Sequence, residues 1–182
     1  MIEATQRKFN EAQFFYRHLV NERQRPSMNE PGAFGYYFSA FLSAARSVPW
    51  RMQNEEQEKY LAWNPTWEEK LTTEERKLLK LTNELRLDEV KREGANTIVE
   101  WEEIAIHELL GANLDLERQH PAYGMRWSSQ PGVPSAKGRR PAYYLEHEDG
   151  KAEVTAMCKQ YLEYLEKLIR KFLWAHNQQP PP

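Results

Sequence analysis

The sequence has a single cysteine and no long apolar run near its start, and both absences exclude classes of protein. With only Cys158 among 182 residues, the chain can form no intrachain disulfide and no zinc site built from several cysteines. The first 20 residues contain Glu3 and Glu11 and lack an apolar run followed by a small-residue cleavage site. We therefore predict neither a signal peptide nor a transmembrane span, and we expect a soluble, cytoplasmic protein.

An excess of charge of either sign is also missing. The 25 lysines and arginines are balanced by 27 aspartates and glutamates, which leaves a net charge of -2. A chain with this balance does not attract nucleic acid as a whole, so any such binding requires a local basic patch. At this length we predict one domain over residues 1–177, followed by a Gln- and Pro-rich tail at 178–182 that is disordered by composition.

Motifs of the common catalytic sites are missing as well. The sequence has no G-x-S-x-G, no P-loop and no G-x-G-x-x-G, so nothing indicates acyl, phosphoryl or hydride transfer. A di-iron bundle needs two Glu-x-x-His pairs, and only Glu117 and His120 have this spacing. Glu103 and His107 can share one face of a helix or strand, but one such pair is common by chance. We expect no metal site and no cofactor, and we interpret Cys158 as a small core residue.

Apolar side chains recur at helical spacing in four long segments. This periodicity predicts helices over about residues 2–24, 34–52, 72–93 and 155–176. Pro49 in the second segment predicts a bend or break at residues 47–50, after which the helix resumes and ends at residues 63–65. The predicted fold class is therefore mainly α, a helical bundle of four principal helices.

An insertion at about residues 95–153 is predicted before the last helix, with a small antiparallel β element and a Pro-rich flap. Residues 97–110 alternate apolar and polar side chains, which favours a strand, and a short helix is the alternative. Residues 121–141 contain four prolines and three glycines, which predicts a loop. The dipeptide Asp149-Gly150, with alternating residues on both sides, indicates a hairpin.

Arg46 places a cation in the middle of the most apolar helix. A buried guanidinium is costly unless it is paired and hydrogen-bonded. We therefore expect a carboxylate on a facing helix, with Glu84 and Asp88 as the candidates by register. One interpretation is a structural ion pair that fixes helix packing. The alternative is an anion- or substrate-binding arginine that lines a pocket.

The run NELRLDEVKREG at residues 83–94 is dense in charge at a helix end. Most runs of this kind form a solvated helix face. The alternative is a groove, to which the run would contribute alongside Arg46. The candidate ligand-binding groove comprises Arg46, Glu84, Arg86, Asp88 and Lys91.

The flap is the second candidate site, because its basic residues are interleaved with aromatic ones and accompanied by no acid. Cations beside aromatic rings are the combination used to bind single-stranded nucleic acid. Four positive charges support only weak binding with a strong salt dependence. The alternative is a mobile lid or a packed flap. The candidate RNA-binding residues are Arg126, Trp127, Lys137, Arg139 and Arg140.

Three segments, FNEAQFFYRHL, GYYFSAFLSAARSVPWRMQ and ELRLDEVKREG, resemble the HEPN-like helical domains of prokaryotic toxin and antitoxin systems. The resemblance covers about residues 9–93. Such domains are helical bundles, often dimeric, and many are ribonucleases that carry Arg-x(4–6)-His on a late helix. The resemblance therefore implies a helical protein that acts in a bacterial cytoplasm.

The catalytic motif of that family is degenerate in this chain. Its arginine corresponds to Arg86, but Leu87 replaces the polar residue that often follows, and Lys91 stands where the histidine would fall. The nearest downstream histidine, His107, lies far outside the spacing. A lysine with an ordinary pKa of about 10.4 cannot replace imidazole as a base at neutral pH. What the resemblance implies therefore shifts from cleavage to binding or assembly.

We predict a non-catalytic HEPN-like binding or assembly module that acts as a homodimer, with a protein or RNA as a further partner and no membrane. The dimer is indicated by 6 Trp, 9 Tyr and 7 Phe, more than one small core is expected to hide. One alternative is a metal-independent ribonuclease whose site is built from Arg46, Arg86 and Lys91. The other is a small-molecule-binding bundle that uses the same groove under the flap.

Overall fold

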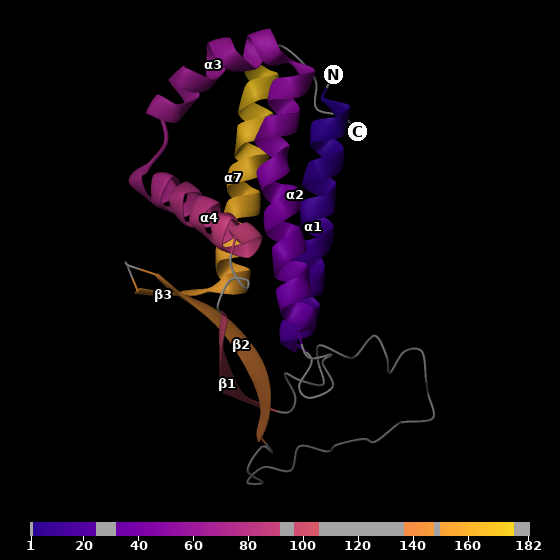
Figure 1. Cartoon of the computed structure of the whole chain (residues 1–182), viewed down its shortest axis with the longest axis vertical. Helices are drawn as coiled ribbons and strands as arrows, with labels where there is room; N and C mark the ends of the chain where they lie inside the picture. The colour runs from indigo at the N-terminus through magenta and orange to yellow at the C-terminus, as the bar shows by residue number, and fades with distance from the viewer. Residues whose placement is uncertain (1, 25–31, 92–96, 106–136, 148–149, 177–182) are drawn as a thin grey trace, which may run out of the picture.

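The computed structural model of the protein describes residues 2–24, 32–91, 97–105, 137–147 and 150–176. This part of the chain contains five helices and one three-stranded antiparallel sheet (Figure 1). The elements are α1 (Glu3–Gln24), α2 (Ala33–Glu55), α3 (Gln57–Glu69), α4 (Thr73–Lys91), β1 (Thr97–Ala105), β2 (Lys137–His147), β3 (Gly150–Glu153) and α7 (Val154–Ala175). The predicted class, mainly α with a small β insertion, is confirmed.

Three long helices, α1, α2 and α7, run side by side and hold most of the core (Figure 1). Their apolar stripes meet in the centre, where Leu19, Phe41 and Phe172 are fully buried. Burial of such side chains is the main favourable term in folding. The predicted helices over 2–24 and 155–176 agree with α1 and α7 to within one or two residues.

A carboxylate at the end of α2 caps the start of α1. Glu55 Oε1 accepts a hydrogen bond from Ala4 N at 2.8 Å, and Glu55 Oε2 accepts bonds from Thr5 N and Thr5 Oγ1, each at 2.7 Å. The first backbone N–H groups of a helix have no partner inside the helix. Glu55 therefore supplies partners for two of these N–H groups, and it fixes the two helices against each other.

The helix does not break at Pro49 as predicted. α2 continues through Pro49 and ends at Glu55, and the following residue, Glu56, leaves helical geometry with φ -137° and ψ 53°. Val48 and Met52 lie on either side of Pro49 and are fully buried. We infer that their packing outweighs the hydrogen bond that proline cannot make.

The helix end predicted at residues 63–65 is also wrong, because α3 continues through Pro65 to Glu69. A hydrogen bond of 2.7 Å from Asn64 Nδ2 to Glu68 Oε1 spans the proline. The ring of Trp63 lies 5.4 Å from that of Phe172 and 5.3 Å from that of Trp67, measured between centroids. These contacts hold α3 across one end of the bundle, and α4 returns along its side (Figure 1).

The sheet lies at the opposite end of the bundle, in the order β1-β2-β3. Residues 97–105 form a strand, which decides against the helical alternative there, and the hairpin around Gly150 is confirmed. Residues 137–141 belong to β2 and not to a loop, since they pair with Trp101 through Ala105 of β1. Residues 106–136, with most of the predicted flap, and the tail at 178–182 lie outside the described residues. Within the described ranges, no helix is long and apolar enough to cross a membrane.

Candidate functional site

A pocket of about 820 Å³ opens among α2, α3, α4 and α7, under the arch that α3 and α4 make beside the bundle (Figure 1). This volume falls in the range of about 300 to 1,000 Å³ that is usual for ligand sites. Three arginines, Arg46, Arg76 and Arg86, line it, against one carboxylate, Glu68. We call this site the arginine pocket.

Arg46 and Arg86 reach the arginine pocket from two different helices, α2 and α4. Both side chains are half-buried. In the described part of the chain, no carboxylate lies within ion-pair distance of either guanidinium. Tyr161 of α7 lines the same pocket, and both charges oppose the rise that burial causes in its pKa. The structure thus brings together the two arginines that the sequence singled out.

One face of α4 supplies two of the pocket's three lining arginines. Arg76, Leu79, Asn83 and Arg86 line it at intervals of three and four residues, which is the repeat of a single helix face. Arg76 donates to the backbone oxygens of Glu68 and Leu71, so it also holds the end of α3. Sequence analysis missed Arg76 and Asn83, although their spacing from Arg86 is a signal that could have found them.

Glu84 is not the partner of Arg46 that the register predicts. It lies on another face of α4, where it pairs with Lys80 at 3.7 Å and lines a second pocket of about 670 Å³ beside β3 and α7. Asp88 and Lys91 belong to the last turns of α4, and their side chains lie outside the described residues. Of the predicted groove residues whose side chains the structure describes, Arg46 and Arg86 line the same cavity and Glu84 lines another.

Three tyrosines form the inner wall of the arginine pocket. Burial raises the pKa of Tyr161 to about 12, and a hydrogen bond with Thr82 and the charges of Arg46 and Arg86 act in the opposite direction. Burial also raises the pKa of Tyr60 to about 12, and it raises that of Tyr164. At neutral pH these hydroxyls are protonated, so they can donate hydrogen bonds and cannot act as bases.

Among the described residues that line this pocket, the groups that could serve as a base or a nucleophile are the carboxylate of Glu68 and the hydroxyl of Ser47. Its lining contains no histidine and no cysteine. Cys158 is fully buried on α7, where desolvation raises the pKa of its thiol well above the ordinary 9.0. The ranges that the structure describes also hold no group of three or more metal-ligating side chains.

The basic residues of the predicted flap that the structure describes are paired with acids. Arg140 Nε lies 3.1 Å from Glu102 Oε2, and Arg139 Nη2 lies 4.0 Å from Glu103 Oε1. Both glutamates stand directly opposite these arginines on β1. The stretch itself contains no acid, but in space β1 supplies one beside each of these two arginines. Arg126 and Trp127 lie outside the described residues, as does the side chain of Lys137 on β2.

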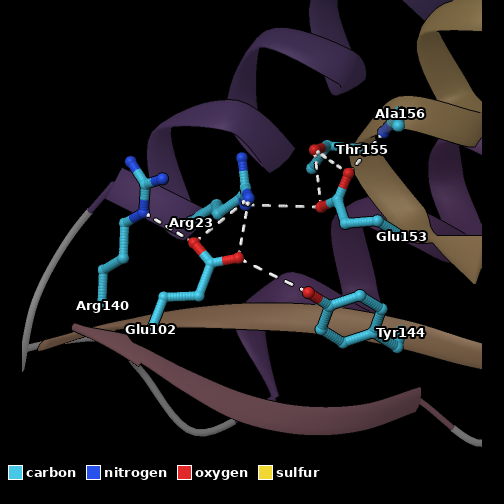
Figure 2. Close-up of polar contacts among 7 residues, drawn as sticks. All are labelled: Arg23, Glu102, Arg140, Tyr144, Glu153, Thr155 and Ala156. Carbon is cyan, nitrogen blue, oxygen red and sulfur yellow. Dashed lines mark hydrogen bonds and ion pairs between the residues drawn. The ribbon is translucent and has the colours of Figure 1, made fainter. Parts of the chain in front are cut away.

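A network of charges ties the sheet to the bundle (Figure 2). Arg23, at the end of α1, pairs with Glu102 of β1 at 3.4 Å and with Glu153 at 3.3 Å. Glu102 also accepts a hydrogen bond from Tyr144 of β2 at 3.4 Å. Glu153 caps α7, since it accepts a bond from Ala156 N at 2.6 Å. These residues lie far apart in the chain, and nothing in the sequence points to their meeting.

Every described charge in this network has a partner, so we interpret it as structural. The arginine pocket differs, because the cations of Arg46 and Arg86 line a cavity and form no ion pair with a carboxylate among the described residues. Comparison of the chain with family models, with curated proteins and with solved structures found no match. Function is therefore inferred from the pocket itself.

Proposed function

We propose that the protein is a non-catalytic binding module of HEPN-like type, and that its ligand is an anion held in the arginine pocket. One observation carries the proposal: two half-buried guanidinium groups from α2 and α4 line the same open cavity without a carboxylate partner among the described residues. Arginine presents its donors in a planar fork that matches the oxygens of carboxylate and phosphate.

The energetic argument concerns the neighbouring positive charges. Two guanidinium groups in a partly desolvated pocket repel each other, and each loses some of its hydration. A bound anion removes both penalties, since it neutralises the charge and accepts the hydrogen bonds. Structural ion pairs of this protein look different, as the Arg23 network shows (Figure 2).

Binding is favoured over cleavage by the chemistry of the pocket wall. A metal-independent ribonuclease needs a group that exchanges a proton near neutral pH. The described lining contains no histidine, and its tyrosines Tyr60 and Tyr161 have pKa values of about 12. Its one carboxylate, Glu68, has no histidine or second carboxylate in the described lining with which to share the two proton transfers of cleavage. A preparation that cuts RNA without added metal, and loses this activity on Arg86→Ala, would support the ribonuclease instead.

The experiment is a thermal unfolding series with inorganic phosphate. Ligand at about ten times its Kd stabilises a protein by about 1.4 kcal/mol, which corresponds to a rise in Tm of roughly 3 to 6 °C at this chain length. We expect this rise for the parent protein and for Arg170→Met, the matched control, because Arg170 is exposed on α7 and does not line the pocket. Arg86→Met should fold and show a rise of only about 1 °C, because a tenfold weaker Kd reduces the stabilisation to about 0.4 kcal/mol. An equal rise in all three proteins would contradict the proposal.

The homodimer and the cytoplasmic setting are part of the same proposal. The dimer is supported by large aromatic side chains left exposed, among them Trp174 at 77%, Tyr36 at 69% and Trp101 at 57%. Aromatic residues of this kind are enriched at protein interfaces. Light scattering at micromolar concentration should give twice the mass of one chain, and a monomeric mass would contradict the dimer.

A further inference from the structure

The arginine pocket has one largely exposed tryptophan in its described lining. Trp50 lines the pocket and is 56% exposed. It follows Arg46 by four residues on α2, so both side chains lie on one helix face. The guanidinium of Arg51 stands 5.0 Å from the centroid of the Trp50 ring. This contact lies on one side of the indole, and more than half of the surface of Trp50 stays exposed.

Other tryptophans near the pocket are engaged within the fold. Trp67 is buried, stacks on Trp63 with centroids 5.3 Å apart, and its Nε1 donates to the hydroxyl of Tyr164. Trp50 shares no ring contact of this kind in the described residues. An exposed indole at the mouth of a cationic cavity is suited to bind an aromatic group of a ligand.

We propose that the ligand of the arginine pocket is an aryl phosphate, a phosphate monoester attached to an aromatic ring. This inference rests on the proposed function and names the ligand class. The phosphate lies between Arg46 and Arg86, which donate to its oxygens. The ring stacks on Trp50, and the apolar side chain of Leu79 lines the cavity beside it. Stacking on an aromatic side chain adds a factor of about ten or more in affinity.

Two phosphate monoesters that differ only in the ring provide the test. Phenyl phosphate and methyl phosphate are titrated by calorimetry into the parent protein, Trp50→Ala and Trp174→Ala. Trp174 is the matched control, because it is 77% exposed and has the ammonium of Lys171 at 5.8 Å, yet it does not line the pocket. Arg86→Met is the variant that removes one of the two phosphate-binding arginines.

The parent and Trp174→Ala should bind phenyl phosphate at least about tenfold more tightly than methyl phosphate. In Trp50→Ala the two affinities should become equal, with the affinity for methyl phosphate unchanged. Arg86→Met should bind both esters at least about tenfold more weakly than the parent. If the parent binds both esters equally well, the ring site is refuted while the anion site stands. If the parent binds neither, the proposed function fails and the ring site fails with it.

Discussion

Replacing Glu55 by glutamine tests how the first two helices are joined. The carboxylate of Glu55 accepts three hydrogen bonds from Ala4 and Thr5, two of them from backbone N–H groups at the start of α1. Glutamine keeps one oxygen acceptor but places an NH₂ group where the second oxygen accepted bonds. The substitution therefore leaves at least one donor at the helix start without a partner.

The magnitude follows from the value of a helix cap. Loss of an N-terminal cap costs about 0.5 to 2 kcal/mol. Glu55 is only partly buried, so water replaces some of the lost bonding, and we expect about 1 kcal/mol at pH 7. With a urea dependence of about 2 kcal/mol per molar, the midpoint of unfolding should fall by about 0.5 M.

The pH dependence adds a second readout. Burial alone would raise the pKa of Glu55, but hydrogen bonds from Thr5 and Ala4 outweigh it and lower the pKa below the ordinary 4.5. A carboxyl whose pKa is lowered by folding stabilises the protein above its unfolded pKa, and this contribution is lost as the pH falls through the folded pKa. The difference between the parent and Glu55→Gln should therefore be full at pH 7 and shrink below about pH 4.5.

Urea unfolding followed by circular dichroism at pH 7 and at pH 3 measures both effects. Glu166→Gln is the control, because Glu166 is exposed on α7 and makes no contact with α1 or α2 that the structure records. It should leave the midpoint within experimental error. Equal stability of the parent and Glu55→Gln at pH 7 would refute the cap, and a difference that does not change with pH would refute its electrostatic part.

Three further substitutions test the core, the network and the pocket. Phe172→Ala removes a fully buried ring that contacts the ring of Trp63, so urea unfolding should show a loss of about 3 to 5 kcal/mol. Glu102→Ala removes the carboxylate that Arg23 and Arg140 share. We expect the free energy of unfolding to fall by about 1 to 2 kcal/mol, and hydrogen exchange to become faster in β1 and β2 than in α7. Arg46→Met should unfold at a urea concentration no lower than the parent does, since it removes a half-buried charge that has no carboxylate partner in the described residues. A clear fall in the unfolding midpoint would indicate that Arg46 has a structural role.

The long helices and the hairpin could be predicted from the sequence because their signals are local. α7 carries apolar residues at strict helical spacing, and members of this stripe such as Tyr161, Leu165 and Leu168 are buried. Asp149-Gly150 marks a turn by its backbone preferences alone, and Gly150 has a φ of 124° that few other residues adopt.

The continuation of α2 and α3 through Pro49 and Pro65 could not be predicted, because tertiary packing decides it. A proline costs about 3 kcal/mol in a helix interior, and the sequence does not reveal whether the surrounding packing exceeds this cost. At Pro49 the neighbours Val48 and Met52 are fully buried, and at Pro65 the helix is held by Trp67. The actual break at Glu56 has no sequence signal that we recognise.

The candidate site was predictable in part. Arg46 could be identified because a cation in an apolar helix is costly to bury without a partner. Arg86 could be identified from the charged run at the end of α4. Which face of α4 packs inward could not be determined, since its leucines cover a wide stripe and Thr82, at 3% exposure, is buried among them. For that reason Glu84 was assigned to the wrong side of the helix. The acids that neutralise Arg139 and Arg140 became visible only with the strand register.

Calorimetric titration of inorganic phosphate into the parent, Arg46→Met, Arg86→Met and the double variant tests the central claim most directly. Because both guanidinium groups hold the same anion, each single variant should bind phosphate at least about tenfold more weakly. The double variant should not bind it measurably. If the double variant binds phosphate as tightly as the parent does, the anion binds away from Arg46 and Arg86, and the central claim is contradicted.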